Sequence, residues 1–139
     1  MIIAAEFSWP VRVYYEDTDS GGVVYYANYL KFMERARTAW LRSLGFEQDR
    51  LLQQEGIAFA VRRVAIDFIH PARFNDALLV NSRIKQRRKV SLTFQHQIIR
   101  QQDEKLLVGG DVQVACIDLG SFRPTSIPHN ILSRVPDVV

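Results

Sequence analysis

A long amphipathic segment near the N-terminus constrains the fold of this chain more than any other feature. Within residues 27–44, large apolar side chains recur at steps of three and four, and charged side chains fill much of the rest. Gly45 follows, at the position where a helix commonly ends on a glycine. The pattern predicts one long helix over about residues 27–44 and a short helical piece over about 47–55 that ends near Gly56.

The rest of the chain has the period of two that is typical of β-strands. Apolar residues alternate over about 57–68, 78–84, 90–98 and 105–118, and a shorter alternation covers 9–16. Short polar stretches separate the four later segments, so we expect hairpin-like turns and an antiparallel sheet. One helix facing one sheet of about five strands places the chain in the α+β class.

Three details concern where the predicted strands are interrupted. Across Arg62-Arg63 the apolar residues change from odd to even positions, which requires an inserted residue, so we predict a β-bulge or a break. The basic run QRRK, residues 86–89, is predicted to be a loop after the strand at 78–84. The proline-containing SFRPTSIP, residues 121–128, is predicted to be irregular.

Size and composition narrow the class of protein. A chain of 139 residues with 47% hydrophobic and 24% charged residues is most simply one globular domain, residues 1–139. No apolar run approaches the ~20 residues that span a bilayer, and the N-terminal segment lacks the positive charge of a signal peptide. The single cysteine, Cys116, suits a reducing compartment. We therefore expect a cytoplasmic protein that does not span a membrane.

Several kinds of chemistry find little support in the sequence. The three histidines show no metal-ligand spacing and no cysteine cluster is present, so we expect no metal site. Cys116 with His70 or His96 could form a nucleophilic pair, but their spacing gives no support, and a buried, unreactive cysteine is the simpler interpretation. A net charge of +3 without a recognition motif argues against nucleic-acid binding.

The most informative stretch, VYYEDTDSGGVVYYANY, joins the first strand to the long helix at residues 13–29. It places Glu16, Asp17 and Asp19 beside Gly21-Gly22 and then an apolar segment. Aspartates before a helix often bond nearby backbone N–H groups, so a purely structural role is one interpretation. The alternative is a reactive site, because the first N–H groups of a helix lack intrahelical partners and carry partial positive charge. A carboxylate beside such donors has the components for acyl chemistry.

The longer run VYYEDTDSGGVVYYANYLKFMERARTAWLRSLG, with the PARFNDAL turn and the RPTSIP tail, resembles the hot-dog-fold acyl-CoA thioesterases of the 4-hydroxybenzoyl-CoA thioesterase type. The resemblance covers most of the chain and is greatest to the YbgC-type branch, which is associated with the Tol-Pal envelope system. It implies a hot-dog fold, in which the sheet wraps around the central helix, and hydrolysis of acyl-CoA without a metal or organic cofactor. It also implies a homodimer or homotetramer with active sites between protomers. The alternative is a scaffold for acyl carrier protein or phospholipid-synthesis enzymes, with weak hydrolysis.

The resemblance also assigns roles to individual residues. Asp19 corresponds to the catalytic carboxylate, which attacks the thioester carbonyl or activates a water. The backbone N–H of Tyr26 corresponds to the group that polarises the carbonyl, and Gly22 to the turn that brings acid and helix terminus together. Many members carry histidine at the position of Tyr26, so a proton-transfer role of that side chain does not carry over. Tyr15 is a candidate pocket wall and Asn28 a candidate hydrogen-bonding group.

Two other acids are alternative candidates for the catalytic group. Glu34 lies mid-helix, where other hot-dog thioesterases place their carboxylate, but Arg35 and Arg37 beside it favour a solvated or ion-paired residue. Asp67 alternates with apolar neighbours and is expected on the opposite face of the sheet.

The basic residues suggest where the nucleotide end of coenzyme A could bind. Arg87 and Arg88 belong to the QRRK run, which is either a solvated turn or a contact for the phosphates. Arg62-Arg63 is a second basic candidate. The sequence leaves these alternatives open.

Overall fold

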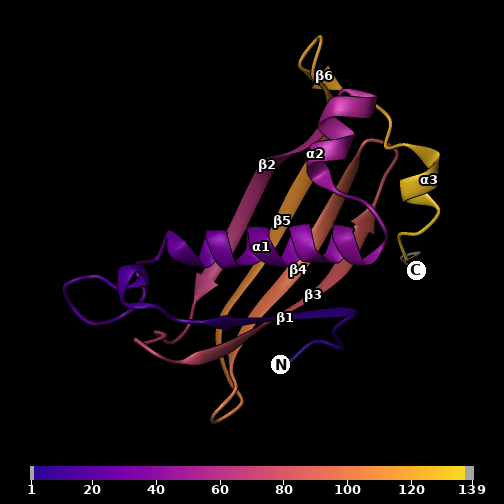
Figure 1. Ribbon diagram of the computed structural model, residues 1–139. Coiled ribbons are helices and arrows are strands. Elements are labelled where there is room, and N and C mark those ends of the chain that lie inside the picture. The colour runs from indigo at the N-terminus through magenta and orange to yellow at the C-terminus, as the bar shows by residue number, and fades with distance from the viewer. Residues whose placement is uncertain (1, 137–139) are drawn as a thin grey trace.

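The computed structural model describes residues 2–136, and its main element is one antiparallel sheet crossed by a helix (Figure 1). The long elements are β1 (Phe7–Arg12), α1 (Asn28–Ser43), β2 (Ile57–Phe68), β3 (Ala77–Arg87), β4 (Ser91–Arg100) and β5 (Lys105–Asp118). The short elements are the 3-10 turn η1 (Tyr15–Asp17), α2 (Gln48–Arg50), the π-helical turn η2 (Leu51–Glu55), β6 (Arg123–Pro124) and α3 (His129–Leu132). None of these helices is both long and apolar enough to cross a membrane.

The strand order is β1-β3-β4-β5-β2, every neighbouring pair is antiparallel, and the short β6 pairs with β5. The predicted α+β class and hot-dog fold are confirmed. The prediction that hairpins join all four later strands was wrong at one connection. β2 pairs with β5 at one edge, whereas β3 lies between β1 and β4, so residues 69–76 lead to a strand that is not a neighbour of β2. A period of two identifies a strand but not its partner.

The bulge predicted at Arg62-Arg63 is confirmed. The pairing of β2 with β5 shifts register between Val61 and Arg63. Because of this shift, Phe59 at an odd position and Ile66 at an even position both pack against the core.

The loop predicted for QRRK was wrong for its first two residues. β3 continues through Arg87, with a second register shift between Ile84 and Gln86. Only Arg88 and Lys89 belong to the turn, where the Arg88 N–H donates to the Ser91 carbonyl at 2.9 Å. A charged run does not end a strand when alternate positions face solvent.

The first strand is shorter at its C-terminal end than the predicted 9–16. Asp17 donates its N–H to the Tyr14 carbonyl at 3.0 Å and accepts the Tyr14 N–H on its carboxylate at 2.8 Å. These local bonds compete with strand pairing and produce η1 instead. Pro10 is tolerated within β1 because this is an edge strand.

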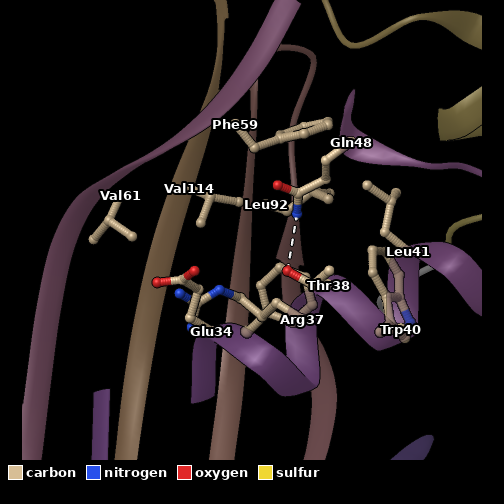
Figure 2. Close-up of a pocket in the computed structure, with 11 residues that line it drawn as sticks. Glu34, Arg37, Thr38, Trp40, Leu41, Gln48, Phe59, Val61, Leu92 and Val114 are labelled. Carbon is tan, nitrogen blue, oxygen red and sulfur yellow. Dashed lines mark hydrogen bonds between the residues drawn. The ribbon is translucent and has the colours of Figure 1, made fainter. Parts of the chain in front are cut away.

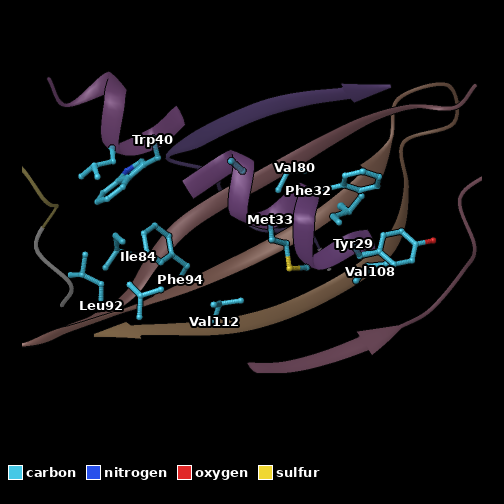
Figure 3. Close-up of a cluster of buried hydrophobic side chains, with 14 of the residues drawn as sticks. Tyr29, Phe32, Met33, Trp40, Val80, Ile84, Leu92, Phe94, Val108 and Val112 are labelled. Atoms are coloured by element: carbon cyan, nitrogen blue, oxygen red, sulfur yellow. The ribbon is translucent and has the colours of Figure 1, made fainter. Parts of the chain in front are cut away.

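The core lies between α1 and the concave face of the sheet (Figure 3). Phe32, Met33 and Ala36 of α1 are fully buried. Trp40 meets Phe94 edge to face with ring centroids 5.0 Å apart. Each large side chain buried in this way contributes roughly 1.5–3 kcal/mol. The amphipathic pattern at 27–44 therefore marks the helix correctly to within one residue at each end.

The N-terminal end of α1 is tied to the segment that precedes β3. The Tyr29 hydroxyl accepts the backbone N–H of Ala72 at 3.0 Å, and the Val24 N–H donates to the Ala72 carbonyl at 2.9 Å. The loop before α1 and the segment after β2 are thereby held side by side, and this is where the candidate site lies.

Candidate active site

Residues 17–25 form a small hairpin-like loop between η1 and α1. The Tyr25 N–H donates to the Asp17 carbonyl, and the Asp19 N–H donates to the Val23 carbonyl, each at 2.9 Å. The side-chain amide of Asn28 also donates to the Asp17 carbonyl, at 2.9 Å. Asn28 therefore fixes the loop against the first turn of the helix.

Asp19 lies at the tip of this loop with an exposed side chain. Its Oδ1 accepts the Gly21 N–H at 2.8 Å, and its backbone carbonyl accepts the Gly22 N–H at 3.0 Å. Gly22 has φ of +80°, where a residue with a Cβ is strained even though the space around it is open. Within residues 2–136, Oδ2 of Asp19 has no hydrogen-bond partner. The turn thus holds one carboxylate oxygen and leaves the other open.

The structure separates the acids that the sequence places together. The Asp17 carboxylate accepts the Tyr14 N–H and belongs to the local turn, whereas the Asp19 carboxylate is held only within its own tight turn. Asp67 lines a hollow on the face of the sheet opposite to α1, together with Lys85 and Asp111. The Asp19 carboxylate is therefore less committed to the local structure than that of Asp17.

The backbone N–H of Tyr26 is an open donor. A turn precedes α1, in which the Asn28 N–H donates to the Tyr25 carbonyl at 2.8 Å and the Tyr29 N–H to the Tyr26 carbonyl at 3.4 Å. Among the hydrogen bonds of the described residues, none has the Tyr26 N–H as donor. This N–H therefore remains available to a ligand oxygen.

The aromatic side chains beside this N–H form an exposed surface. Tyr26 is 61% exposed and meets Phe68 edge to face, with ring centroids 6.1 Å apart. A hydrogen bond with the Tyr26 hydroxyl, and charge repulsion from it, raise the pKa of Tyr25. Tyr15 is 80% exposed and meets Phe74 edge to face at 5.6 Å.

A cavity of about 230 Å³ adjoins Tyr26. It is lined by Val24, Tyr26, Tyr29, Phe68, Ile69, His70 and Pro71. The sequence pattern of His70 does not predict its place here. No local pattern could have revealed it, because the end of β2 and the start of α1 meet only in the folded sheet.

A second cavity, of about 180 Å³, lies between α1 and the sheet (Figure 2). Gln48 donates to the Thr38 hydroxyl at 3.2 Å on one side of it. Its other lining residues are Glu34, Arg37, Trp40, Leu41, Phe59, Val61, Leu92, Phe94 and Val114. The cavity is mostly apolar, with charged side chains only from α1.

A buried polar chain holds the arginine of this cavity in place. The Arg37 guanidinium donates to Nε2 of His96 at 3.1 Å, so Nδ1 carries the hydrogen and donates to the Ser82 hydroxyl at 2.7 Å. Burial, reinforced by the charge of Arg37, lowers the pKa of His96 to about 3. Burial also lowers the pKa of Arg37 to about 10, and the negative charge of Glu34 acts in the opposite direction. Glu34 is exposed, in agreement with a solvated residue.

Cys116 is buried and unreactive. It is fully inaccessible in β5, and burial raises the pKa of its thiol to about 11. Both ring nitrogens of His96 are engaged by Arg37 and Ser82, so His96 cannot activate it. Within residues 2–136, no group of three or more His, Cys, Asp or Glu side chains is placed to hold a metal ion.

The structure does not bring the basic candidates to the acidic loop. The turn between β3 and β4 lies beside α3, across the sheet from residues 17–25 (Figure 1). The half-buried Arg87 donates to the carbonyls of Leu132 and Val135, at 3.0 and 3.1 Å. Arg88 is exposed, as are Arg62 and Arg63 on β2. Arg87 therefore has a structural role, and the neighbouring exposed arginines remain accessible to a ligand.

The fold and the loop before α1 together define a thioesterase of the hot-dog class. The family model described as the Thioesterase-like superfamily matches residues 13–135, and the chain belongs to this superfamily of enzymes. It is 44% identical over 125 residues to acyl-CoA thioesterase YbgC of Haemophilus influenzae, covering 90% of each chain. It is also 43% identical over 128 residues to acyl-CoA thioester hydrolase YbgC of Escherichia coli, covering 92% of this chain and 94% of that one. The resemblance to the YbgC-type branch is confirmed.

Solved structures agree with this assignment. A 1,4-dihydroxy-2-naphthoyl-CoA thioesterase from Synechocystis superposes with a TM-score of 0.87 at 27% identity, covering 93% of this chain and 94% of that one. A probable thioesterase from Bartonella henselae gives a TM-score of 0.82 at 35% identity, covering 87% and 98%.

Proposed function

We propose that this protein is an acyl-CoA thioesterase, which hydrolyses acyl-CoA to a free carboxylic acid and CoA. Asp19 is the catalytic carboxylate, and the backbone N–H of Tyr26 polarises the thioester carbonyl. One observation carries the proposal: the loop before α1 combines an exposed carboxylate held by its own turn with an unpaired N–H two residues before the helix. Membership of a thioesterase family supports it.

The proposed chemistry uses the two groups for different tasks. The carbonyl oxygen of the substrate accepts the Tyr26 N–H, and the partial positive charge at the start of α1 stabilises the negative charge that develops there. Asp19 either attacks the carbonyl carbon, which gives a mixed anhydride, or removes a proton from the attacking water. After single-turnover hydrolysis in ¹⁸O-labelled water, label in the Asp19 carboxylate identifies the anhydride route, because solvent oxygen enters that group only when water opens an anhydride at the Asp19 carbonyl carbon.

The remaining predicted residues support this centre. Gly22 permits the turn at Asp19, and Asn28 fixes that loop to the helix. Tyr15 serves as a wall beside the site. Arg88 lies across the sheet from this centre, so as the candidate for the phosphates of CoA it requires a site formed between two protomers. Arg87 positions its turn by holding the C-terminal segment.

The edge of the sheet supports the predicted homodimer or homotetramer. β2 is an edge strand, and its exposed residues include Val61 at 52%, Val64 at 40% and Phe68 at 52%. An unpaired edge with exposed apolar side chains is a template for pairing with another chain. A second copy added at β2 would lie beside both cavities, because Phe68 lies close to Tyr26 and Val61 lines the cavity under α1.

The proposal includes a single domain over residues 1–139 and a cytoplasmic location. The described residues, 2–136, share one sheet and one core, which supports one domain. No feature of the described residues favours the scaffold alternative with acyl carrier protein or phospholipid-synthesis enzymes.

The test is hydrolysis of a panel of acyl-CoA thioesters by the parent and by Asp19→Asn. The amide keeps the shape of the side chain and can neither attack nor accept the proton, so we expect kcat to fall by about 10²- to 10⁴-fold. Asp17→Asn is the matched control, since its carboxylate accepts the Tyr14 N–H within a local turn. If Asp19→Asn retains the parental rate, Asp19 is not the catalytic carboxylate.

A further inference from the structure

The cavity beside Tyr26 contains one imidazole that the proposed chemistry does not yet use. The other polar side chains that line this cavity are those of Tyr26 and Tyr29, and both hydroxyls make hydrogen bonds. The Tyr29 hydroxyl accepts the Ala72 N–H at 3.0 Å, and the Tyr26 hydroxyl is hydrogen bonded with Tyr25. His70 lines the same cavity, and its ring has no hydrogen-bond partner within residues 2–136. The one uncommitted polar side chain of this wall is therefore an imidazole.

The backbone around His70 is fixed on both sides. The N–H groups of Ile69 and His70 both donate to the Leu107 carbonyl, at 2.8 and 3.0 Å. Two residues further on, the Ala72 carbonyl accepts the Val24 N–H at 2.9 Å. β5 thus holds the segment on one side and the loop before α1 holds it on the other. The imidazole projects from a braced segment, as a group that acts on a substrate requires.

Besides polarising the carbonyl, an enzyme that hydrolyses a thioester must supply a proton to the leaving sulfur. An aliphatic thiol has a pKa near 8.5, so the departing sulfur takes up a proton at neutral pH. Imidazole exchanges protons readily in this range, whereas a phenol with a pKa near 10 is a poorer acid. The sulfur is bonded to the same carbon as the oxygen that accepts the Tyr26 N–H. A donor for the sulfur must therefore lie near the cavity that Tyr26 and His70 both line.

We propose that His70 is the general acid that protonates the CoA sulfur as the C–S bond breaks, an inference that rests on the proposed function. In the general-base route, Asp19 takes a proton from water, the C–O bond forms, and the His70 imidazolium gives its proton to sulfur. The proton on Asp19 then returns to His70 through solvent. In the anhydride route, His70 protonates the sulfur first and then accepts the proton of the water that opens the anhydride. Either route consumes one water and yields the acid and the thiol.

The test compares two thioesters of the same acyl group that differ in their need for a proton. N-acetylcysteamine leaves as a basic alkyl thiolate, whereas thiophenol leaves as a weakly basic aryl thiolate. We expect His70→Gln to lower kcat/KM on the alkyl thioester by about 10²-fold and to change the aryl thioester little. A loss of structure lowers kcat/KM on both thioesters alike. The ratio of the two kcat/KM values therefore reports the proton transfer alone. His129→Gln removes an exposed histidine of α3 and should leave both rates unchanged.

A second variant distinguishes loss of the imidazole from misfolding. In His70→Ala, added imidazole should restore turnover of the alkyl thioester, because the ring that it replaces is exposed. A parallel fall of both rates without rescue, or no change in either, overturns the role of His70. If the parent hydrolyses thioesters and Asp19→Asn does not, such a result leaves the proposed function standing. An inactive parent overturns the proposed function and this inference together.

Discussion

The two ends of α1 are built differently. At the C-terminal end the carbonyls of Arg42 and Leu41 are satisfied: the Gly45 N–H donates to Arg42 at 2.9 Å and the Phe46 N–H donates to Leu41 at 3.2 Å. Gly45 has φ of +98°, the left-handed conformation that completes this type of helix end. Arg134 then donates to the Leu44 carbonyl at 2.6 Å. The end is closed by its own chain.

At the N-terminal end, by contrast, polar groups are left available. The Tyr26 N–H has no partner among the described residues, and the rings of Tyr25 and Tyr26 are 47% and 61% exposed. Unsatisfied donors at a helix start are normally covered by a capping side chain, and no side chain caps α1. The proposed function requires this contrast, with an open end that can bind a ligand and a closed end that stabilises the helix.

Of the effects expected from comparing the two ends, the largest tests whether the open N–H is functional. Tyr26 is the second residue of the turn that the Asn28 N–H closes on the Tyr25 carbonyl, a position that accepts proline. Tyr26→Pro removes the N–H and Tyr26→Ala keeps it, while both remove the ring. We expect kcat of the proline variant to be about 10²- to 10³-fold below that of the alanine variant, the usual cost of losing such a donor. Equal kcat values for the two variants would show that the N–H does not polarise the substrate.

The second prediction concerns the closed half of α1, where Arg37 is bonded to buried His96. The pKa of His96 is lowered to about 3 in the folded chain, so between that value and about 6.5 only the unfolded chain binds the proton. The stability contributed by neutral His96 is complete above pH ~6.5 and falls by up to about 1.4 kcal/mol per pH unit below it. Urea unfolding at pH 7, 6, 5 and 4 measures this slope.

His96→Gln provides the control for that slope. Glutamine can accept from Arg37 and donate to Ser82 without titrating, so its stability should depend less on pH. If the difference in the free energy of unfolding between the parent and His96→Gln stays constant from pH 7 to 4, His96 is not the source of the pH dependence.

The sequence predicted the elements of this fold better than their partners. The period at 27–44 and the change of parity at Arg62-Arg63 are local patterns, and the structure confirms the helix and the bulge. The connection from β2 to β3 was wrong because strand partners depend on contacts across the sheet. β1 was predicted too long at its C-terminal end because the bonds of Asp17 to Tyr14 override the alternation of apolar residues.

The candidate site was predictable where a motif lies in one segment. Asp19, Gly22 and Tyr26 come from one loop, and their roles remain proposals that the resemblance supports. His70 was missed because only the packing of the segment after β2 against that loop brings it there. For Arg87 the sequence leaves a solvated turn and a phosphate contact open, and it does not reveal the carbonyls of Leu132 and Val135 as its partners.

The third prediction tests whether closure of the C-terminal end is structural only. Arg134→Ala removes the bond to Leu44 and the contact of the guanidinium with the Phe46 ring, 5.2 Å from its centroid. We expect a loss of about 1–2 kcal/mol in the free energy of unfolding, with kcat unchanged. Arg35→Ala, at an exposed position of α1, is the matched loss of charge and should cost less than ~0.5 kcal/mol. A fall in kcat for Arg134→Ala alone would mean that the closed end also serves the chemistry.

The smallest expected effect concerns a third region, the turn after β3. Arg88 is exposed there, and its loss should weaken binding of the nucleotide without touching the reacting carbonyl. We expect Arg88→Gln to raise KM for acyl-CoA about three- to fivefold, since an exposed charge contact is worth up to ~1 kcal/mol, and to leave kcat unchanged. Lys105→Gln removes one exposed charge at the start of β5 and should leave KM unchanged.

A short thioester without the nucleotide has no phosphates. Its KM should therefore be the same for Arg88→Gln and for the parent. If KM rises for that substrate as well, the effect of Arg88 reaches the acyl site and the turn is not simply a phosphate contact.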